Sequence, residues 1–224
     1  MKIMRCLVVV VAMALFSAPR IHGQDLSKYR AFSFGTTLPD LAKQVDAKPT
    51  DAIVVHEHPA LIEELTWRPT QPLNSAVRAE PVQKVLFSFY NGALYRMLVT
   101  YDISATKGLT DEDMIGVVSA QYGPATTPVA DVSFPTEPSY RKTERVIARW
   151  EDSQYSFNLL RSYWSNAFEI VMFAKQMDAQ AGISIAESVK MEQQQAPQKQ
   201  AAQVAKEADD LERERQKNIE TLRP

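Results

Sequence analysis

The stretch VLFSFYNGALYRMLVTYD, from Val85 to Asp102, decides the fold. Its two apolar runs flank Asn91-Gly92, a dipeptide that readily adopts the positive φ angles of a two-residue hairpin turn. The stretch therefore predicts two antiparallel strands joined by a tight turn. Pairing outward from the turn places Phe89/Leu94, Phe87/Arg96 and Val85/Leu98 on one face, and Tyr90/Ala93, Ser88/Tyr95 and Leu86/Met97 on the other.

Neither face of the predicted hairpin has the polar character of a solvated surface. A sheet with one face in water alternates apolar and polar residues, and a large exposed apolar patch marks an interaction site. We expect the second face to be covered by other strands, by the C-terminal segment or by a partner, and we favour cover from within the chain. If a partner covers it, the candidate binding residues are Tyr90, Tyr95, Met97 and Tyr101.

Two capping signals predict helices on either side of this hairpin. Thr37 and Thr110 are each followed three residues later by an aspartate, and Gly123-Pro124 ends the second helix. Runs rich in β-branched and aromatic residues predict further strands at 52–57, 61–67, 145–150, 154–161 and 167–175. We expect the proline-containing segment before residue 145 to be a long loop.

The two halves of the chain share a sequence pattern. GTTLPDLAKQV (Gly35–Val45) and GLTDEDMIGVV (Gly108–Val118) both fit G-x-T-x-x-D-[LM]-x-x-x-V, and a predicted hairpin follows each. We interpret this as a degenerate duplication, with chance matching of capping signals as the alternative. The predicted fold is α+β, with antiparallel sheet and helices on one face, in units 24–104 and 105–175.

The C-terminal segment, 176–224, has a different composition, rich in Ala, Gln, Glu and Lys. Met177, Ala181, Ile185 and Val189 recur at four-residue spacing, which predicts a helix docked on the sheet. QQQAPQKQAAQ, at 193–203, predicts a loose hinge. The charged residues after it predict a second helix, either solvated or paired in a coiled coil.

The capped motifs, together with Tyr122-Gly123-Pro124, resemble the G-M-T-x-x-x-V … G-x-P signature of small bacterial envelope modules. These include the small lipoprotein of the outer-membrane β-barrel assembly machinery and the tandem units of β-lactamase inhibitor proteins. The lipidated cysteine of the lipoprotein has no counterpart here. The resemblance implies helices on one face of an antiparallel sheet, and binding of other proteins rather than catalysis.

The first 23 residues predict a secretory signal peptide. Lys2 and Arg5 precede an apolar run, Cys6–Phe16, that is shorter than the roughly 20 residues needed to span a bilayer. We expect cleavage between Gly23 and Gln24, with an uncleaved membrane anchor as the alternative. The protein is then secreted, and periplasmic in a bacterium, and touches the membrane only through this segment.

Removal of these residues leaves 22 basic and 27 acidic residues and no cysteine. The acidic balance offers no basic patch for nucleic acid. Without cysteine, the mature chain can form neither a disulfide nor a thiolate metal site.

His56-Glu57-His58 is the one pattern that resembles a metal site. Residues two apart on a strand share a face, so both imidazoles could reach one ion with Glu63 or Glu64. Alternatively, both are ordinary surface residues at a strand end before Pro59.

We predict no cofactor and favour a non-enzymatic binding or scaffold protein of the cell envelope. One alternative is a metal-binding protein or metal-dependent hydrolase using His56 and His58. Another is a small-ligand carrier with its pocket between helices and sheet.

Overall fold

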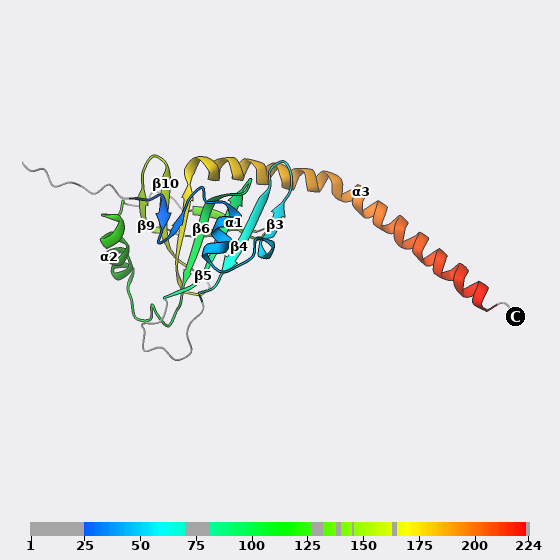
Figure 1. Ribbon diagram of the computed structural model, residues 1–224, viewed down its shortest axis with the longest axis horizontal. Helices are drawn as coiled ribbons and strands as arrows, with labels where there is room; N and C mark the ends of the chain where they lie inside the picture. Colours follow the sequence, from blue (N-terminus) through cyan, green and yellow to red (C-terminus); the bar gives the residue numbers. More distant parts are fainter. Residues whose placement is uncertain are drawn as a thin grey trace, which may run out of the picture.

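A computed structural model describes residues 25–69, 81–126, 132–137, 140–144, 146–162 and 165–222. At its centre lies one antiparallel sheet of seven strands in the order β3-β4-β5-β6-β11-β10-β9 (Figure 1). The strands are β3 (Ile53–His56), β4 (Ile62–Trp67), β5 (Val82–Tyr90), β6 (Ala93–Tyr101), β9 (Val146–Glu151), β10 (Tyr155–Arg161) and β11 (Phe168–Ala174). The predicted α+β class with an antiparallel sheet is confirmed.

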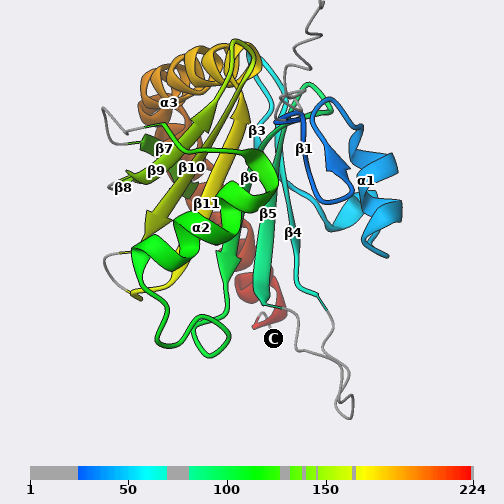
Figure 2. The ribbon, with the colours of Figure 1, turned by 90° about the vertical axis from the view of Figure 1, so that its left-hand side faces the viewer.

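Helices cover both faces of this sheet. Helices α1 (Leu38–Gln44) and α2 (Asp111–Tyr122) lie on one face, and α3 (Lys175–Thr221) crosses the other and then leaves the sheet (Figures 1 and 2). The predicted helical C-terminal extension is therefore confirmed. The smaller elements are β1 (Lys28–Tyr29), β2 (Phe32–Ser33), the 3-10 turn η1 (Pro49–Asp51), β7 (Val132–Glu137) and β8 (Tyr140–Glu144).

The predicted capping residues begin α1 and α2. The Thr37 hydroxyl accepts a hydrogen bond from the Asp40 N–H at 3.3 Å, and the Thr110 hydroxyl accepts one from the Asp113 N–H at 3.2 Å. The Asp113 carboxylate accepts in turn from the Thr110 N–H at 2.9 Å and from the Thr110 hydroxyl at 3.1 Å, and these two bonds lower the pKa of Asp113. Gly123 ends α2 with a φ of 81°, as predicted.

The hairpin of β5 and β6 has the predicted turn but a different register. Asn91 and Gly92 have φ angles of 48° and 79°, and the first pairs, Tyr90/Ala93 and Phe89/Leu94, are as expected. Beyond them a β-bulge shifts the register by one residue, so the predicted pairs there are wrong. The observed pairs are Ser88/Arg96, Phe87/Met97, Leu86/Leu98 and Val85/Val99.

The main core lies between the sheet and helices α1 and α2. Five large side chains at its centre have no exposed surface: Phe87, Phe89, Met97, Trp150 and Phe157. The Trp150 indole N–H donates to the Gly123 carbonyl at 2.8 Å, which joins β9 to the end of α2.

The prediction of a long loop before residue 145 is wrong. The predicted loop before residue 145 contains β7 and β8, which pair as a separate two-stranded sheet. In the part of the chain that the structure describes, β8 is the strand paired with β7, so Pro135 sits on an edge strand, where a missing N–H is tolerated.

The predicted hinge at 193–203 is helical, because α3 continues through Pro197. Its Gln, Ala and Lys neighbours are good helix formers, and a helix can pass a proline by bending. In Figure 1 the axis of α3 changes direction in its orange part.

Both predicted units contribute to the one sheet. Counted from either edge inward, the strands follow chain order, and the last strand of each unit, β6 or β11, pairs with the other at the centre. Helix α1 precedes the first set and α2 the second. The duplication stays an interpretation of the sequence.

We expect Phe87→Ala to lower the free energy of unfolding by about 4 kcal/mol, because it leaves a cavity in the main core. Chemical denaturation measures the loss. Val117→Ala on α2 is the control: Val117 is 63% exposed, and we expect a change below about 0.5 kcal/mol. Equal effects at the two positions would contradict the assigned core.

Candidate functional site at the junction of α3 and the sheet

The four candidate binding residues of the hairpin do not share one face. Tyr90 and Tyr95 face α3, with ring centroids 6.5 Å apart, whereas Met97 and Tyr101 belong to the core under α1 and α2. The bulge is the reason, because it adds one residue to β6 and reverses the expected sides beyond it. The cover predicted from within the chain is α3, which buries Tyr95.

The bulge also points Arg96 toward α3, next to Tyr95. The Arg96 guanidinium donates from Nε to the Asp178 carboxylate at 2.7 Å, and its Nη2 contacts the same oxygen. The two side chains are only 11% and 19% exposed. This buried ion pair joins the central strand β6 to the first turn of α3.

Further polar groups lie near this ion pair. Ser88 donates to the Glu64 carboxylate at 3.3 Å, and burial raises the pKa of Glu64 above its ordinary value of 4.5. Burial also raises the pKa of Tyr95 to about 12. The sheet face under α3 is therefore a mixed surface of aromatic and charged groups shielded from water.

Small side chains allow α3 to approach the sheet. Ala181, Ser184 and Ser188 are the buried residues of this helix, and Met177 and Ile185 pack beside them. The predicted stripe thus identified the docked segment, but it did not include the two serines. Ser184 follows Ala181 by three residues and Ser188 follows Ser184 by four, and this helical spacing was the signal that the sequence offered.

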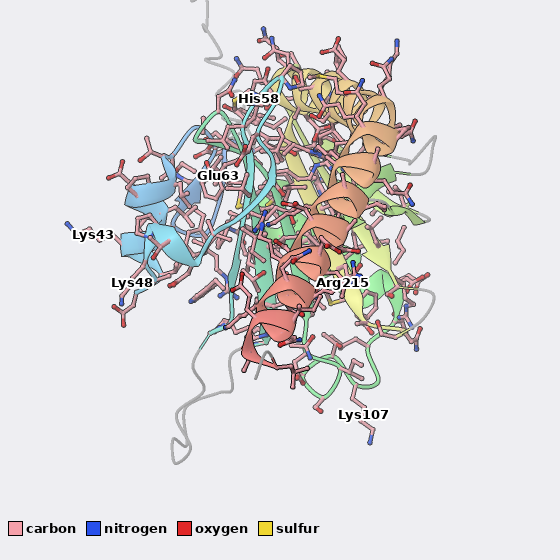
Figure 3. All side chains as sticks on the ribbon, turned by 90° about the vertical axis from the view of Figure 1, so that its right-hand side faces the viewer. Lys43, Lys48, His58, Glu63, Lys107 and Arg215 are labelled. Carbon is pink, nitrogen blue, oxygen red and sulfur yellow. The ribbon has the colours of Figure 1, made fainter. Side chains whose placement is uncertain are left out.

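The end of β3 and the middle of α3 border a cavity of about 360 Å³. Ser188 donates to the His58 carbonyl, and His56 Nδ1 lies 3.2 Å from the Glu192 carboxylate. Figure 3 shows this side of the molecule, with His58 at the turn beside α3 and Glu63 further along β4. The lining residues are Val54, Val55, His56, Glu57, His58, Ser188, Met191, Glu192, Gln195 and Lys199.

The two histidines occupy different environments. His56 is buried, 4% exposed, whereas His58 is exposed. Glu192 is the described partner of His56 Nδ1, and His56 Nε2 is buried without a hydrogen-bond partner among the described residues. Within those residues, no group of three or more His, Cys, Asp or Glu side chains is placed to hold a metal ion.

The far part of α3 projects away from the sheet. From Lys190 to Leu222 every residue is exposed. Arg213 pairs with Asp209 and Asp210, and Arg215 pairs with Glu212, all within the helix. Among the described residues, no helix combines the length and apolar character needed to cross a membrane.

Comparison of the chain with protein-family models, with curated proteins and with solved structures found no match.

We expect Asp178→Ala to lower the free energy of unfolding by about 3 kcal/mol, because it leaves the Arg96 guanidinium buried without its counter-charge. Asp209→Ala is the matched control: it removes the Asp209–Arg213 pair, whose side chains are 63% and 69% exposed, and should cost less than about 1 kcal/mol. Thermal and chemical denaturation compare the two. Similar losses would contradict a structural role for the Arg96–Asp178 pair.

Glu64→Gln should stabilise the protein at neutral pH. Because the folded state raises the pKa of Glu64, it favours the protonated carboxyl, and that stabilisation is lost as the pH rises through the folded-state pKa. Glutamine does not ionise and can still accept from Ser88. We expect the variant to exceed the wild type in stability at pH 7, with the difference shrinking as the pH falls through the folded-state pKa toward 4.5 and largely gone below it, as measured by denaturation between pH 3 and 8. A constant difference across this range would count against the burial of a charged carboxylate.

Proposed function

We propose that this protein is a secreted or periplasmic, non-enzymatic binding or scaffold protein of the cell envelope, and that α3 is its contact element. The observation that carries the proposal is the exposed segment 190–222 of α3. At 1.5 Å per residue it extends about 50 Å. Helices in proteins gain most of their stability from tertiary packing, so a long helix that buries no face of its own is well suited to pack against a partner.

The base of α3 is fixed to the sheet at three points. Asp178 pairs with Arg96 and Ser188 bonds to the His58 carbonyl. One turn further on, Glu192 contacts His56. Because these contacts span four turns of helix, the projecting part leaves the core in a defined direction. A defined direction favours a scaffold role over that of a flexible tether.

The predicted export and the family resemblance agree with this proposal. The N-terminal segment has the charge and length of a signal peptide, and the modules that the capped motifs resemble bind other proteins. The metal-dependent and small-ligand alternatives stay predictions from the sequence.

Site-specific photo-crosslinking in the cells that produce the protein tests the contact element. We expect a photoreactive residue at Leu211, which is 68% exposed on α3, to form a discrete crosslinked species. The matched control is Val117, which is 63% exposed on α2 and should form none. Fractionation of the same cells should recover the chain outside the cytoplasm with Gln24 at its N-terminus.

The result that would overturn the proposal is equally direct. A chain that stays in the cytoplasm rules out the proposed location, and a chain that forms no crosslink at Leu211, Val204 or Leu222 rules out α3 as the contact element. A crosslink at Val117 of equal yield would show that the capture is not specific to α3.

A further inference from the structure

The outer edge of the sheet at β3 is open. In the described residues β3 has a single strand neighbour, β4, so the backbone groups on its other side point away from the sheet. Edge strands are commonly protected by lysine, proline or a covering element. Strand β3, with the sequence IVVH, is short and has a register shift between Val54 and His56, but it contains neither lysine nor proline and leaves Ile53 and Val54 70% and 47% exposed.

Helix α3 forms the second wall beside this edge. Ser188, Glu192, Gln195 and Lys199 follow one face of the helix and border the 360 Å³ cavity together with residues 54–58. The bonds Ser188–His58 and Glu192–His56 fix the spacing of the two walls. The result is a preformed groove, which we call the β3–α3 groove, with a strand edge on one side and a helix on the other.

The chemistry of the walls favours an extended occupant over a helical one. A bound amphipathic helix needs a broad apolar surface, but Met191 is the only apolar side chain that α3 contributes to the groove lining. The strand edge instead offers a row of main-chain donors and acceptors. An extended peptide can satisfy those groups by adding a strand.

The charges around β3 define the ends of that occupant. Asp51 precedes the strand, where its carboxylate also accepts a hydrogen bond from the Lys48 N–H at 2.9 Å, and Glu57 follows the strand; both are exposed. Within the groove, Glu57 and Glu192 outnumber Lys199. A basic side chain at each end of the bound segment would complement these carboxylates.

We propose that the β3–α3 groove binds an extended segment of a partner protein by strand addition to β3, and that the segment has basic residues at both ends and β-branched residues between them. On α3 this site extends from Ser188 to Lys199, whereas the crosslinking position Leu211 lies about three turns further along the helix. Its test is therefore distinct from the crosslinking at Leu211, and either proposal can fail while the other holds.

The probe is a fluorescent synthetic peptide, Lys-Thr-Val-Thr-Val-Thr-Lys, which matches the segment from Asp51 to Glu57 in length. With the full mature chain we expect saturable binding by fluorescence anisotropy below about 1 mM, a range typical of weak specific contacts. The same peptide with glutamate in place of both lysines should bind about tenfold more weakly. Added salt should weaken the lysine peptide, because the pairing carboxylates are exposed.

Two surface variants locate the site. Ile53→Lys adds a protective charge to the open edge and should weaken binding about tenfold, and Glu57→Lys should weaken it about fivefold. Glu207→Lys, the same charge change on the projecting part of α3, is the control and should leave the affinity unchanged. All three positions are exposed, and equal melting temperatures confirm that the variants fold.

Hydrogen exchange then identifies the binding mode. On addition of the peptide, amides of β3 should gain protection from exchange. The proposal is overturned if no saturable binding occurs at 1 mM, if Ile53→Lys binds as the wild type does, or if the β3 amides stay unprotected. It is also overturned if sedimentation shows a dimer with β3 already protected, because the edge would then be occupied by a second copy of this chain.

Discussion

Among the contacts that attach α3 to the sheet is one buried ion pair, Arg96–Asp178, and that pair depends on one extra residue in β6. The bulge in β6 directs both Tyr95 and Arg96 to the same side of the sheet. Without it, strict alternation would place one of them in the apolar core beneath α1 and α2, where a guanidinium has no counter-charge. With it, Tyr95 packs under the helix while Arg96 meets Asp178.

This arrangement explains why a mostly apolar hairpin lies in the middle of the sheet. On one side, β5 and β6 provide Phe87, Phe89 and Met97 to the main core. On the other, they support a helix through aromatic packing and charge pairing. A ring that lies against a guanidinium can serve both purposes, and Arg96 lies 5.7 Å from the ring centroid of Tyr95 and 5.9 Å from that of Phe173.

Local chemistry made much of the fold predictable from the sequence. The Asn91-Gly92 turn, the threonine caps and Gly123 each require a particular backbone conformation, and each prediction held. The register of the hairpin was not predictable. The bulge involves Tyr95 and Arg96, which are both amphipathic, so the apolar and polar residues of β6 give no sign that their alternation is interrupted there. The path of α3 through Pro197 depends on whether the neighbouring residues can sustain a bent helix. A rule that ends every helix at proline does not take those neighbours into account.

The candidate site was less predictable than the fold, since its contacts join distant parts of the chain. Arg96 and Asp178 are 82 residues apart, and His56 and Glu192 are 136 apart. The sequence singled out His56 for its neighbour His58, whereas the structure pairs it with a glutamate on α3. Only the docking of the helix, which Ala181 and the buried serines permit, brings these groups together.

The projecting part of α3 is better matched to a different protein than to a second copy of itself. The 4-3 seam through Val204, Ala208 and Leu211 continues at Arg215, so a symmetric pair would bring two guanidiniums to its interface. In a parallel pair the flanking residues Glu207 and Glu212 would also face each other across the seam and repel. A partner helix with basic residues beside its apolar seam would instead pair with these carboxylates. Under the two proposals the acidic ends of β3 would favour a basic partner for the same reason, so both surfaces would select for the same kind of charge.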